Sequence, residues 1–326
     1  MSDLVTYVRY MRYLLNKRKP RLTILDISAS CNASCPFCPR VYMPKDRSQG
    51  FMDMSLLKNT VHDLSVNGVH NIRLYSTAEP TLHPCFDDII YHLKNQGMNI
   101  TVSTNASQLM KHKESLGLVD TLQYSIEGWD QVSYEFLRRP LKFGRIQAEL
   151  SQFTDYLHTL DKRPKTSINL LLTKKTDIHG FLDMWGDFVD TVSVNFMMGV
   201  TRYTCGCFVT ETPEELQGYL YPYTVDLKGG CMYPFDILTV AYDGKVALCC
   251  EDFVASLPFG VVQSGVKAVF HSEELQHIRH QYLRGVPEVC RGCNRFRRPL
   301  PGDVDKVRLE IDGLCHPYKN KLVLFL

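Results

Sequence analysis

Three closely spaced cysteines are the residues of this sequence best suited to metal chemistry. Cys31, Cys35 and Cys38 follow an apolar run over residues 22–27 that is typical of a buried strand. Three thiolates can hold three irons of a [4Fe–4S] cube and leave the fourth iron open to a substrate or cofactor. Two alternatives stay open at this point: a zinc site with one open position, and chance clustering of cysteines in a reduced protein.

A second group of cysteines lies in the C-terminal half of the chain. The Asp243-Gly244 pair predicts a hairpin between residues 238–242 and 245–248, and such a hairpin folds the cysteine after it back towards the one before it. A helix predicted over 272–283 leads to a C-x2-C pair. The four candidate ligands are Cys231, Cys249, Cys290 and Cys293. They can close around one metal centre, with a four-thiolate zinc as the alternative and Cys250 as a possible replacement for Cys249.

The composition is that of an ordinary globular protein. The 326 residues are 44% hydrophobic and 22% charged, and the net charge of +2 argues against nucleic acid or an anionic membrane surface as partner. No apolar run reaches the roughly 18–20 residues that span a bilayer. The twelve cysteines occur without a secretory signal, which predicts metal binding in a reducing, cytoplasmic compartment.

Hydrophobic periodicity predicts alternating strands and helices from residue 21 to about residue 200. After the first strand, over 21–28, strands are expected over 69–75, 99–103, 119–124, 166–172 and 191–196. Helices are expected over 54–67, 86–96, 108–116, 143–160 and 179–189, and an amphipathic helix over 3–17 precedes them. This order indicates an α/β fold with a parallel sheet, so ligands should collect where the strands end.

The spacing C-x3-C-x2-C, with Phe37 before the last cysteine, resembles that of the radical S-adenosylmethionine (SAM) superfamily. The resemblance implies a partial (β/α)6, TIM-like barrel. It also implies that the open iron binds the amino and carboxylate groups of SAM. Reductive cleavage of SAM then gives a 5′-deoxyadenosyl radical that removes a hydrogen atom from the substrate.

The same resemblance assigns SAM contacts to the loops that follow the strands. Residues 76–80 are similar to the Gly-Gly-Glu-Pro motif of the family, with Thr77 and Ala78 in place of the glycines. Residues 125–128 are similar to a Ser-Ile-Asp-Gly segment, and Arg138, with Arg139 as the alternative, is expected to pair with the SAM carboxylate. The full set of expected SAM contacts is Phe37, Ala78, Glu79, Ser103, Asn105, Ser125, Arg138, Asn169 and Leu171.

The second cysteine group resembles the SPASM/Twitch extension of radical SAM enzymes. Residues 294–314 contain no further cysteine, which favours a small Twitch-type domain with one auxiliary [4Fe–4S] cluster, making two clusters in total. The predicted organisation is an N-terminal helix over 1–20, the barrel over 21–200, the auxiliary domain over 201–295 and a tail over 296–326. Residues 201–213 are interpreted as a linker.

An auxiliary cluster favours net oxidation of the substrate, whereas a thiol that returns a hydrogen atom would favour epimerisation. The candidate hydrogen-atom donors are Cys205, Cys207 and Cys250. Single-cluster relatives, and the absence of a leader-binding domain, favour a small polar, carbohydrate-like substrate and an external electron donor such as flavodoxin or ferredoxin. The alternatives are a peptide-modifying radical SAM enzyme and, from another class, a non-enzymatic iron–sulfur or zinc-binding protein.

Overall fold

We describe a computed structural model of the chain. It describes residues 8, 11, 19–47, 49–76, 78–204, 207–227, 231–253, 255–257, 259–314 and 317–324. Most of the helix predicted over 3–17 lies outside these ranges, as do Thr77 and Cys205.

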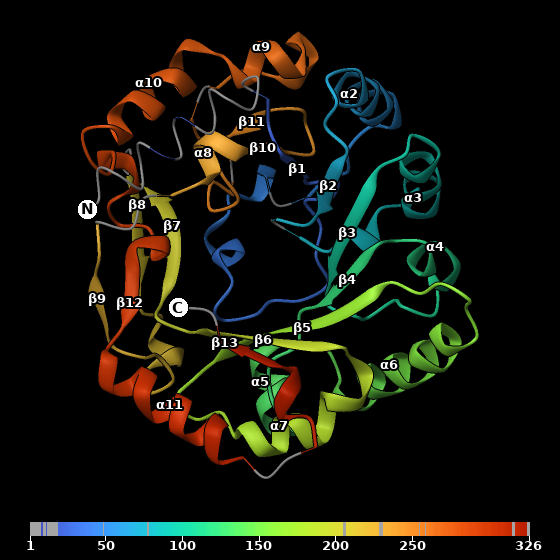
Figure 1. Cartoon of the computed structure of the whole chain (residues 1–326), viewed down its shortest axis with the longest axis vertical. Helices are drawn as coiled ribbons and strands as arrows, with labels where there is room; N and C mark the ends of the chain where they lie inside the picture. Colours follow the sequence, from blue (N-terminus) through green and yellow to red (C-terminus); the bar gives the residue numbers. More distant parts are fainter. Residues whose placement is uncertain are drawn as a thin grey trace.

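Six parallel strands form the centre of the molecule and lie side by side in the order in which they occur along the chain. They are β1 (Leu22–Leu25), β2 (Asn71–Leu74), β3 (Asn99–Thr104), β4 (Thr121–Tyr124), β5 (Lys165–Leu172) and β6 (Thr191–Phe196). Figure 1 shows that the sheet curls into an incomplete barrel. The predicted partial (β/α)6 fold is thereby confirmed.

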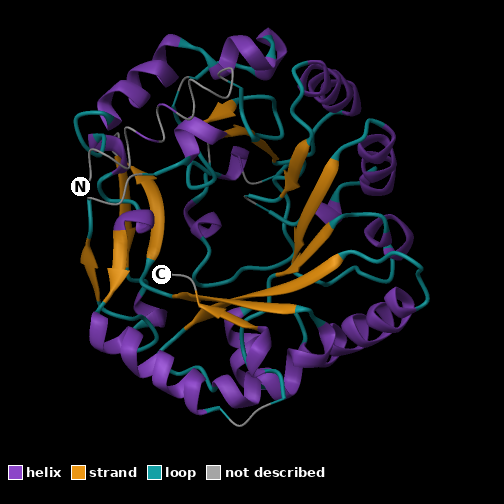
Figure 2. Ribbon diagram, in the orientation of Figure 1, coloured by secondary structure: helices purple, strands orange, loops and turns teal. Residues whose placement is uncertain are grey.

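Helices cover the outer side of this sheet (Figure 2). They are α2 (Met54–Val66), α3 (Phe86–Asn95), α4 (Lys113–Gly117), α5 (Gln131–Leu137), α6 (Phe143–His158) and α7 (Ile178–Trp185). In α2, Leu57, Val61 and Leu64 are buried at helical spacing, and the Asp53 carboxylate caps the first turn. The helix predicted over 108–116 begins only at Lys113, and residues 107–112 form turns instead.

Strands from the C-terminal half extend the same sheet at both edges. β10 (Ile237–Val240) lies parallel to β1 and forms the predicted hairpin with β11 (Val246–Ala247), turning at Gly244 with a φ of 85°. At the other edge, β13 (Leu322–Leu324) lies parallel to β6. The barrel and the C-terminal half therefore share one nine-stranded sheet.

Two antiparallel ribbons stand on the open side of the barrel (Figure 1). β7 (Val200–Thr204) pairs with β8 (Cys207–Glu211), so the interpretation of 201–213 as a linker was wrong. The β-branched residues of these segments favour extended backbone, and Val200 and Phe208 are buried. The second ribbon joins β9 (Tyr223–Val225) to β12 (Arg297–Pro299).

Short helices and one long helix complete the C-terminal half. They are α8 (Tyr233–Asp236), α9 (Val266–Phe270), α10 (Glu273–Tyr282) and α11 (Pro301–Gly313). Ser272 caps α10 by accepting a hydrogen bond from the Leu275 amide, as predicted for this helix. The tail after residue 296 thus supplies two strands and a helix, and it packs on the barrel edge formed by β6.

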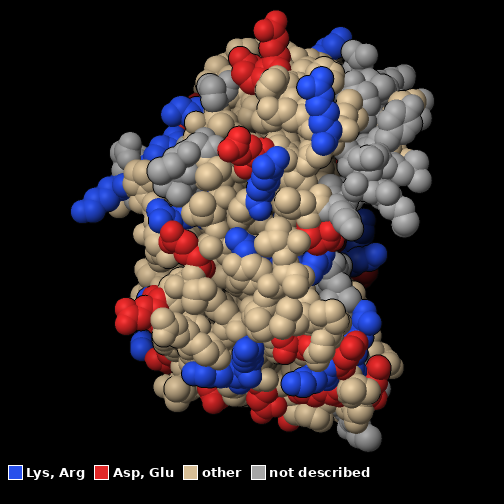
Figure 3. Space-filling view, turned by 90° about the vertical axis from the view of Figure 1, so that its left-hand side faces the viewer, with Lys and Arg blue, Asp and Glu red and all other residues tan. Residues whose placement is uncertain are grey.

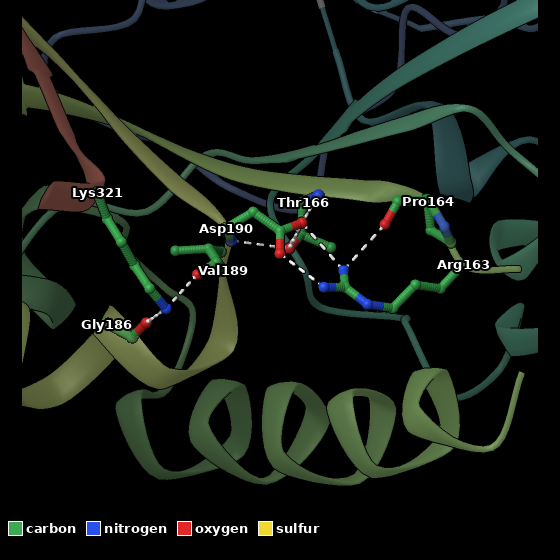
Figure 4. A network of polar contacts seen from close by, with 7 residues as sticks. All are labelled: Arg163, Pro164, Thr166, Gly186, Val189, Asp190 and Lys321. Atoms are coloured by element: carbon green, nitrogen blue, oxygen red, sulfur yellow. Dashed lines mark hydrogen bonds and ion pairs between the residues drawn. The ribbon is translucent and has the colours of Figure 1, made fainter. Parts of the chain in front are cut away.

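Polar contacts fix the amino ends of β5 and β6, away from the carboxyl ends where ligands collect (Figure 4). The Arg163 Nη2 atom lies 2.6 Å from Asp190 Oδ1, and the Thr166 amide donates to Asp190 Oδ2 at 2.8 Å. The hydrogen bond from Arg163 lowers the pKa of Asp190 to about 2. Lys321 donates to the carbonyl oxygens of Gly186 and Val189, which ties the strand β13 to this end.

Charges of both signs are intermixed on the face shown in Figure 3, where neither sign forms a continuous field. Among the described residues, no helix combines the length and the apolar character that crossing a bilayer demands.

Candidate active site

The loop after β1 places three thiols on the wall of a cavity of about 420 Å³ at the carboxyl ends of the first strands. Cys31, Cys35 and Cys38 all line this cavity. Asn32 fixes the loop, because its side chain accepts a hydrogen bond from the side-chain amide of Asn105 and donates one to the Ser107 hydroxyl, both at 2.8 Å. The loop after β3 therefore holds the cysteine loop in place.

The thiols of this loop fit a bound iron–sulfur cluster. Burial raises the pKa of Cys31 and Cys35, and it raises the pKa of Cys38 to about 12. Cluster irons would offset this cost of desolvating the thiolates. Within the described residues, no three Cys, His, Asp or Glu side chains converge on a point that could hold a single ion. A cube carries its irons at separate corners and does not need such convergence.

Most of the predicted SAM contacts surround this same cavity. Its lining includes Ala78, Glu79, Ser103, Asn105, Ser125 and Arg138. Phe37 lies instead behind Arg138, with the guanidinium carbon 5.1 Å from its ring centroid. Asn169 and Leu171, expected near the adenine, line a different cavity. The SAM roles of all these residues stay predictions.

Glu79 joins the loops that follow β2 and β3. Its buried carboxylate accepts hydrogen bonds from the Thr81 hydroxyl and the Thr104 hydroxyl, both at 2.7 Å. It also accepts one from the backbone N–H of Asn105 at 2.6 Å. Burial raises the pKa of Glu79, while these hydrogen bonds lower it. The carboxylate shapes the cavity wall and is placed to accept an ammonium group there.

Arg138 faces the cysteines, whereas Arg139 does not. Arg138 is buried, its Nε donates to the Glu127 carboxylate, and its Nη1 lies 3.6 Å from the Cys35 sulfur. Arg139 pairs with Glu215 at 2.8 Å in an exposed position. Burial raises the pKa of Glu127, and the charge of Arg138 lowers it. Sequence reasoning missed Glu127, although it lies within the segment singled out at 125–128.

A larger cavity, of about 690 Å³, lies between the barrel and the C-terminal half; we call it the central cavity. Its barrel side carries Asn169, Leu171 and Asn195. Its other side is formed by residues that sequence reasoning missed, namely Tyr233, Glu251, Arg295, Arg297 and Arg298. A further cavity of about 630 Å³ inside the barrel shares Tyr75 and Ser103 with the cysteine cavity and Tyr233 and Arg295 with the central one. The three cavities therefore adjoin one another through these shared side chains.

The four cysteines of the second group line one small enclosed space; they are Cys231, Cys249, Cys290 and Cys293, and their role as cluster ligands stays a prediction. Burial, and then the neighbouring thiols, raise the pKa of Cys249 well above its usual range. Within the C-x2-C pair, Gly292 packs directly on the β8 backbone, because a Cβ there would lie 1.9 Å from the Phe208 carbonyl oxygen. Cys231 also lines the central cavity, so the two spaces adjoin.

The three candidate hydrogen-atom donors differ in position. Cys250 lines none of these cavities, but its thiol contacts Tyr233 and Arg295, which line the central cavity. Burial raises the pKa of Cys250 to about 11. Cys207 begins β8 and lines none of these cavities in the described part of the chain. Cys205 lies outside the described residues.

Comparisons with known proteins match two families. The model of the radical SAM superfamily matches residues 25–184, and the model of the SPASM iron–sulfur cluster-binding domain matches residues 231–294. The cofactor-modifying protein of the tungsten-containing aldehyde ferredoxin oxidoreductase from Pyrococcus furiosus is 20% identical over 209 residues, which are 62% of this chain and 56% of that protein. The matched regions span little more than half the length of the curated relatives found.

Two solved structures share the fold. BtrN in complex with AdoMet and 2-DOIA superposes with a TM-score of 0.55 at 16% identity, covering 84% of this chain and 93% of BtrN. SuiB of Streptococcus suis bound to the precursor peptide SuiA gives a TM-score of 0.59 at 15% identity, covering 82% of this chain and 70% of SuiB. The first domain implies SAM and a [4Fe–4S] cluster as cofactors, and the second implies auxiliary iron–sulfur clusters. The chain belongs to the radical SAM superfamily and carries a C-terminal SPASM-type iron–sulfur cluster-binding domain.

Proposed function

We propose that this protein is a radical SAM oxidoreductase that removes a hydrogen atom from a small polar, carbohydrate-like substrate and oxidises it by two electrons. When bound, SAM and the two clusters supply the redox chemistry, namely reductive cleavage of SAM and acceptance of the second substrate electron. An external donor such as flavodoxin or ferredoxin would supply the first electron. The known ligand pair of BtrN, AdoMet and 2-DOIA, is compatible with this reaction class.

The adjacency of the cavities is the observation that carries this proposal. The cavity of the three cysteines adjoins the cavity inside the barrel, which adjoins the central cavity, and the central cavity adjoins the four-cysteine space. A substrate in the central cavity would thus lie between both cofactor sites. The enclosed four-cysteine space has no room for substrate, so its role is electron transfer.

Residues of this chain would orient SAM and the substrate. Arg138, held by Glu127, would receive the SAM carboxylate, and Glu79 would accept a hydrogen bond from its ammonium group. Asn169 and Asn195, on β5 and β6, present amide groups to the central cavity, where they can hydrogen-bond to hydroxyl groups.

Epimerisation is the second candidate, and it is favoured by the contact of Cys250 with Tyr233 and Arg295, which line the central cavity. The Cys250 thiol could return a hydrogen atom to the face opposite the one from which it was removed. The test is turnover in deuterated water with Cys250→Ala and Cys207→Ala compared. If deuterium appears at an inverted carbon, and this incorporation is lost only in Cys250→Ala, the reaction is epimerisation and not oxidation. An oxidised product formed by both variants supports oxidation.

The basic assignment is tested by anaerobic reconstitution of the full chain. We expect about eight irons and eight sulfides, as two cubes require. Addition of SAM and a strong reductant should yield 5′-deoxyadenosine. Stoichiometric zinc without labile sulfide would overturn the proposal, and so would intact SAM after reduction of a fully loaded protein.

A further inference from the structure

Three arginines of one short segment line the central cavity. Arg295, Arg297 and Arg298 follow Cys293 directly, and all three contribute to the same wall. In the described part of the chain, none of them forms an ion pair with a carboxylate. Their positive charges are therefore gathered in a concave space without paired counter-charges.

Neutral groups hold these guanidinium groups in place. Arg295 donates to the Tyr233 hydroxyl at 2.7 Å, and Arg297 donates to the Gly292 carbonyl oxygen at 3.2 Å. Arg298 Nη1 donates to the carbonyl oxygens of Arg295 and Arg297, both at 2.9 Å. Carbonyls and aromatic rings fix the direction of the side chains, and they leave the charge itself available to a ligand.

Arg297 also leaves a polar atom unsatisfied. Its guanidinium carbon lies 4.1 Å from the Tyr223 ring centroid, and its buried Nε has no hydrogen-bond partner among the described residues. A buried donor without a partner costs free energy, and a small rotation of this side chain towards a ligand oxygen in the cavity would remove that cost. The unsatisfied donor and the uncompensated charges thus point to the same kind of ligand.

Acidic groups at this cavity do not cancel the charge. Glu127 is already paired with Arg138 on the side of the three cysteines. Glu251 also lines this cavity, and among the described residues it forms no ion pair with any of the three arginines. Arg297 and Arg298 have no carboxylate among the residues that line this cavity other than these two.

We propose that this wall, the arginine wall formed by Arg295, Arg297 and Arg298, binds a phosphate group of the substrate. A phosphate offers several acceptor oxygens and up to two negative charges, which suits several guanidinium forks better than a single carboxylate does. The inference rests on the proposed function, and it narrows the polar substrate to a phosphorylated one. The phosphate would anchor the substrate at the side of the auxiliary cysteines and leave its other end towards SAM.

The test uses the anaerobically reconstituted full chain with saturating SAM, so that the SAM cavity is filled. Titration calorimetry with inorganic pyrophosphate should show saturable binding. The variant R297Q/R298Q should weaken this binding by at least about tenfold, because charged hydrogen bonds are lost. R308Q, which removes the same charge from an exposed position on α11, serves as the matched control and should bind as the wild type does. If the double variant misfolds, the single variants R298Q and R297K are titrated in its place.

Equal pyrophosphate affinity in the wild type and in a folded R297Q/R298Q variant would overturn the inference, as would an equal loss in R308Q. Citrate binding more tightly than pyrophosphate would replace phosphate by carboxylate. Comparing the affinities for a sugar phosphate and for a nucleoside triphosphate then identifies the class of molecule to which the phosphate is attached. Arginine-dependent binding by a protein that fails to cleave SAM would leave this inference standing and reject the proposed function; SAM cleavage without phosphate binding would do the reverse.

Discussion

The two cysteine groups differ in what surrounds them. Cys31, Cys35 and Cys38 lie on one loop beside a cavity of about 420 Å³, whereas the second group comes from three segments that enclose a small space. The first arrangement leaves room for a ligand next to the sulfurs, and we call these three cysteines the open group. The second leaves no such room, and we call its four cysteines the closed group. The comparison teaches that an open site suits cofactor binding and a closed one suits electron transfer.

Their polar neighbours differ in the same sense. Arg138, a charged donor fixed by Glu127, lies beside Cys35 in the open group. Tyr282 lies beside Cys290 in the closed group. Burial raises the pKa of the Cys290 thiol to about 12, and the hydrogen bond from Tyr282 partly opposes this rise. A charged arginine at the open site can receive an anionic ligand group, while a neutral tyrosine only tunes the sulfur.

The largest effect is expected from removing the open group. Changing Cys31, Cys35 and Cys38 together to Ala should abolish 5′-deoxyadenosine formation and leave about half of the iron, because each cube needs its own thiolates. Iron analysis and product chromatography measure both effects. Cys85→Ala, which removes a thiol outside both groups, is the control and should change neither. SAM cleavage by the triple variant would contradict the assignment.

A second experiment separates the closed group from its neighbour. Cys249→Ser should lose about half of the iron, because Cys249 lines the four-cysteine space, while Cys250→Ser should keep all of it. The iron content and the electron paramagnetic resonance spectrum of the reduced protein distinguish the two variants. Both should still cleave SAM, because the open group is intact. Iron loss in the Cys250 variant instead would exchange the roles of the two cysteines.

Arg138→Lys should weaken SAM binding by about 1–3 kcal/mol, because a bidentate contact with the carboxylate becomes a point contact. Equilibrium binding of SAM to the oxidised, loaded protein measures this loss. Arg139→Lys is the comparison variant, since Arg139 does not line the cavity; it pairs with Glu215, and its Nε donates to the Ser34 carbonyl oxygen at 3.1 Å. If the Arg139 variant loses affinity for SAM and the Arg138 variant does not, the proposed role of Arg138 is wrong.

Local sequence pattern predicted the barrel strands well, because their apolar residues repeat with the period of a buried strand. The strand expected over 166–172 is β5 at Lys165–Leu172, and the helix expected over 54–67 is α2 at Met54–Val66. The pairings of β10 with β1 and of β13 with β6 were beyond such reasoning. Strand partners far apart in the chain are chosen by the packing of the whole sheet.

Within the site, the sequence indicated ligands better than it indicated their supports. The cysteine spacing singled out both groups, and Glu79 and Arg138, expected from the resemblance to contact SAM, line the cavity of the first group. The arginine wall was missed because arginines after a C-x2-C pair look like surface charge until the fold brings them to a cavity. Asn169 and Leu171 line the central cavity and not the cysteine cavity, because the curvature of the sheet, which is not a local property, decides where β5 faces; their expected SAM contacts stay predictions.

The smallest effect concerns the support of the open group. Asn32→Ala removes two hydrogen bonds that hold the cysteine loop to the loop after β3, each worth about 0.5–1.5 kcal/mol, and leaves the Asn105 amide without this partner. We expect a few-fold weaker SAM binding and faster loss of about half of the iron to a chelator, with the other half unaffected. Asn99→Ala, which removes an exposed amide contact with Asn71 at the other end of β3, should change neither quantity. If the chelator removes all the iron from the Asn32 variant at one rate, the two cysteine groups are not independent, and the contrast between an open and a closed site fails.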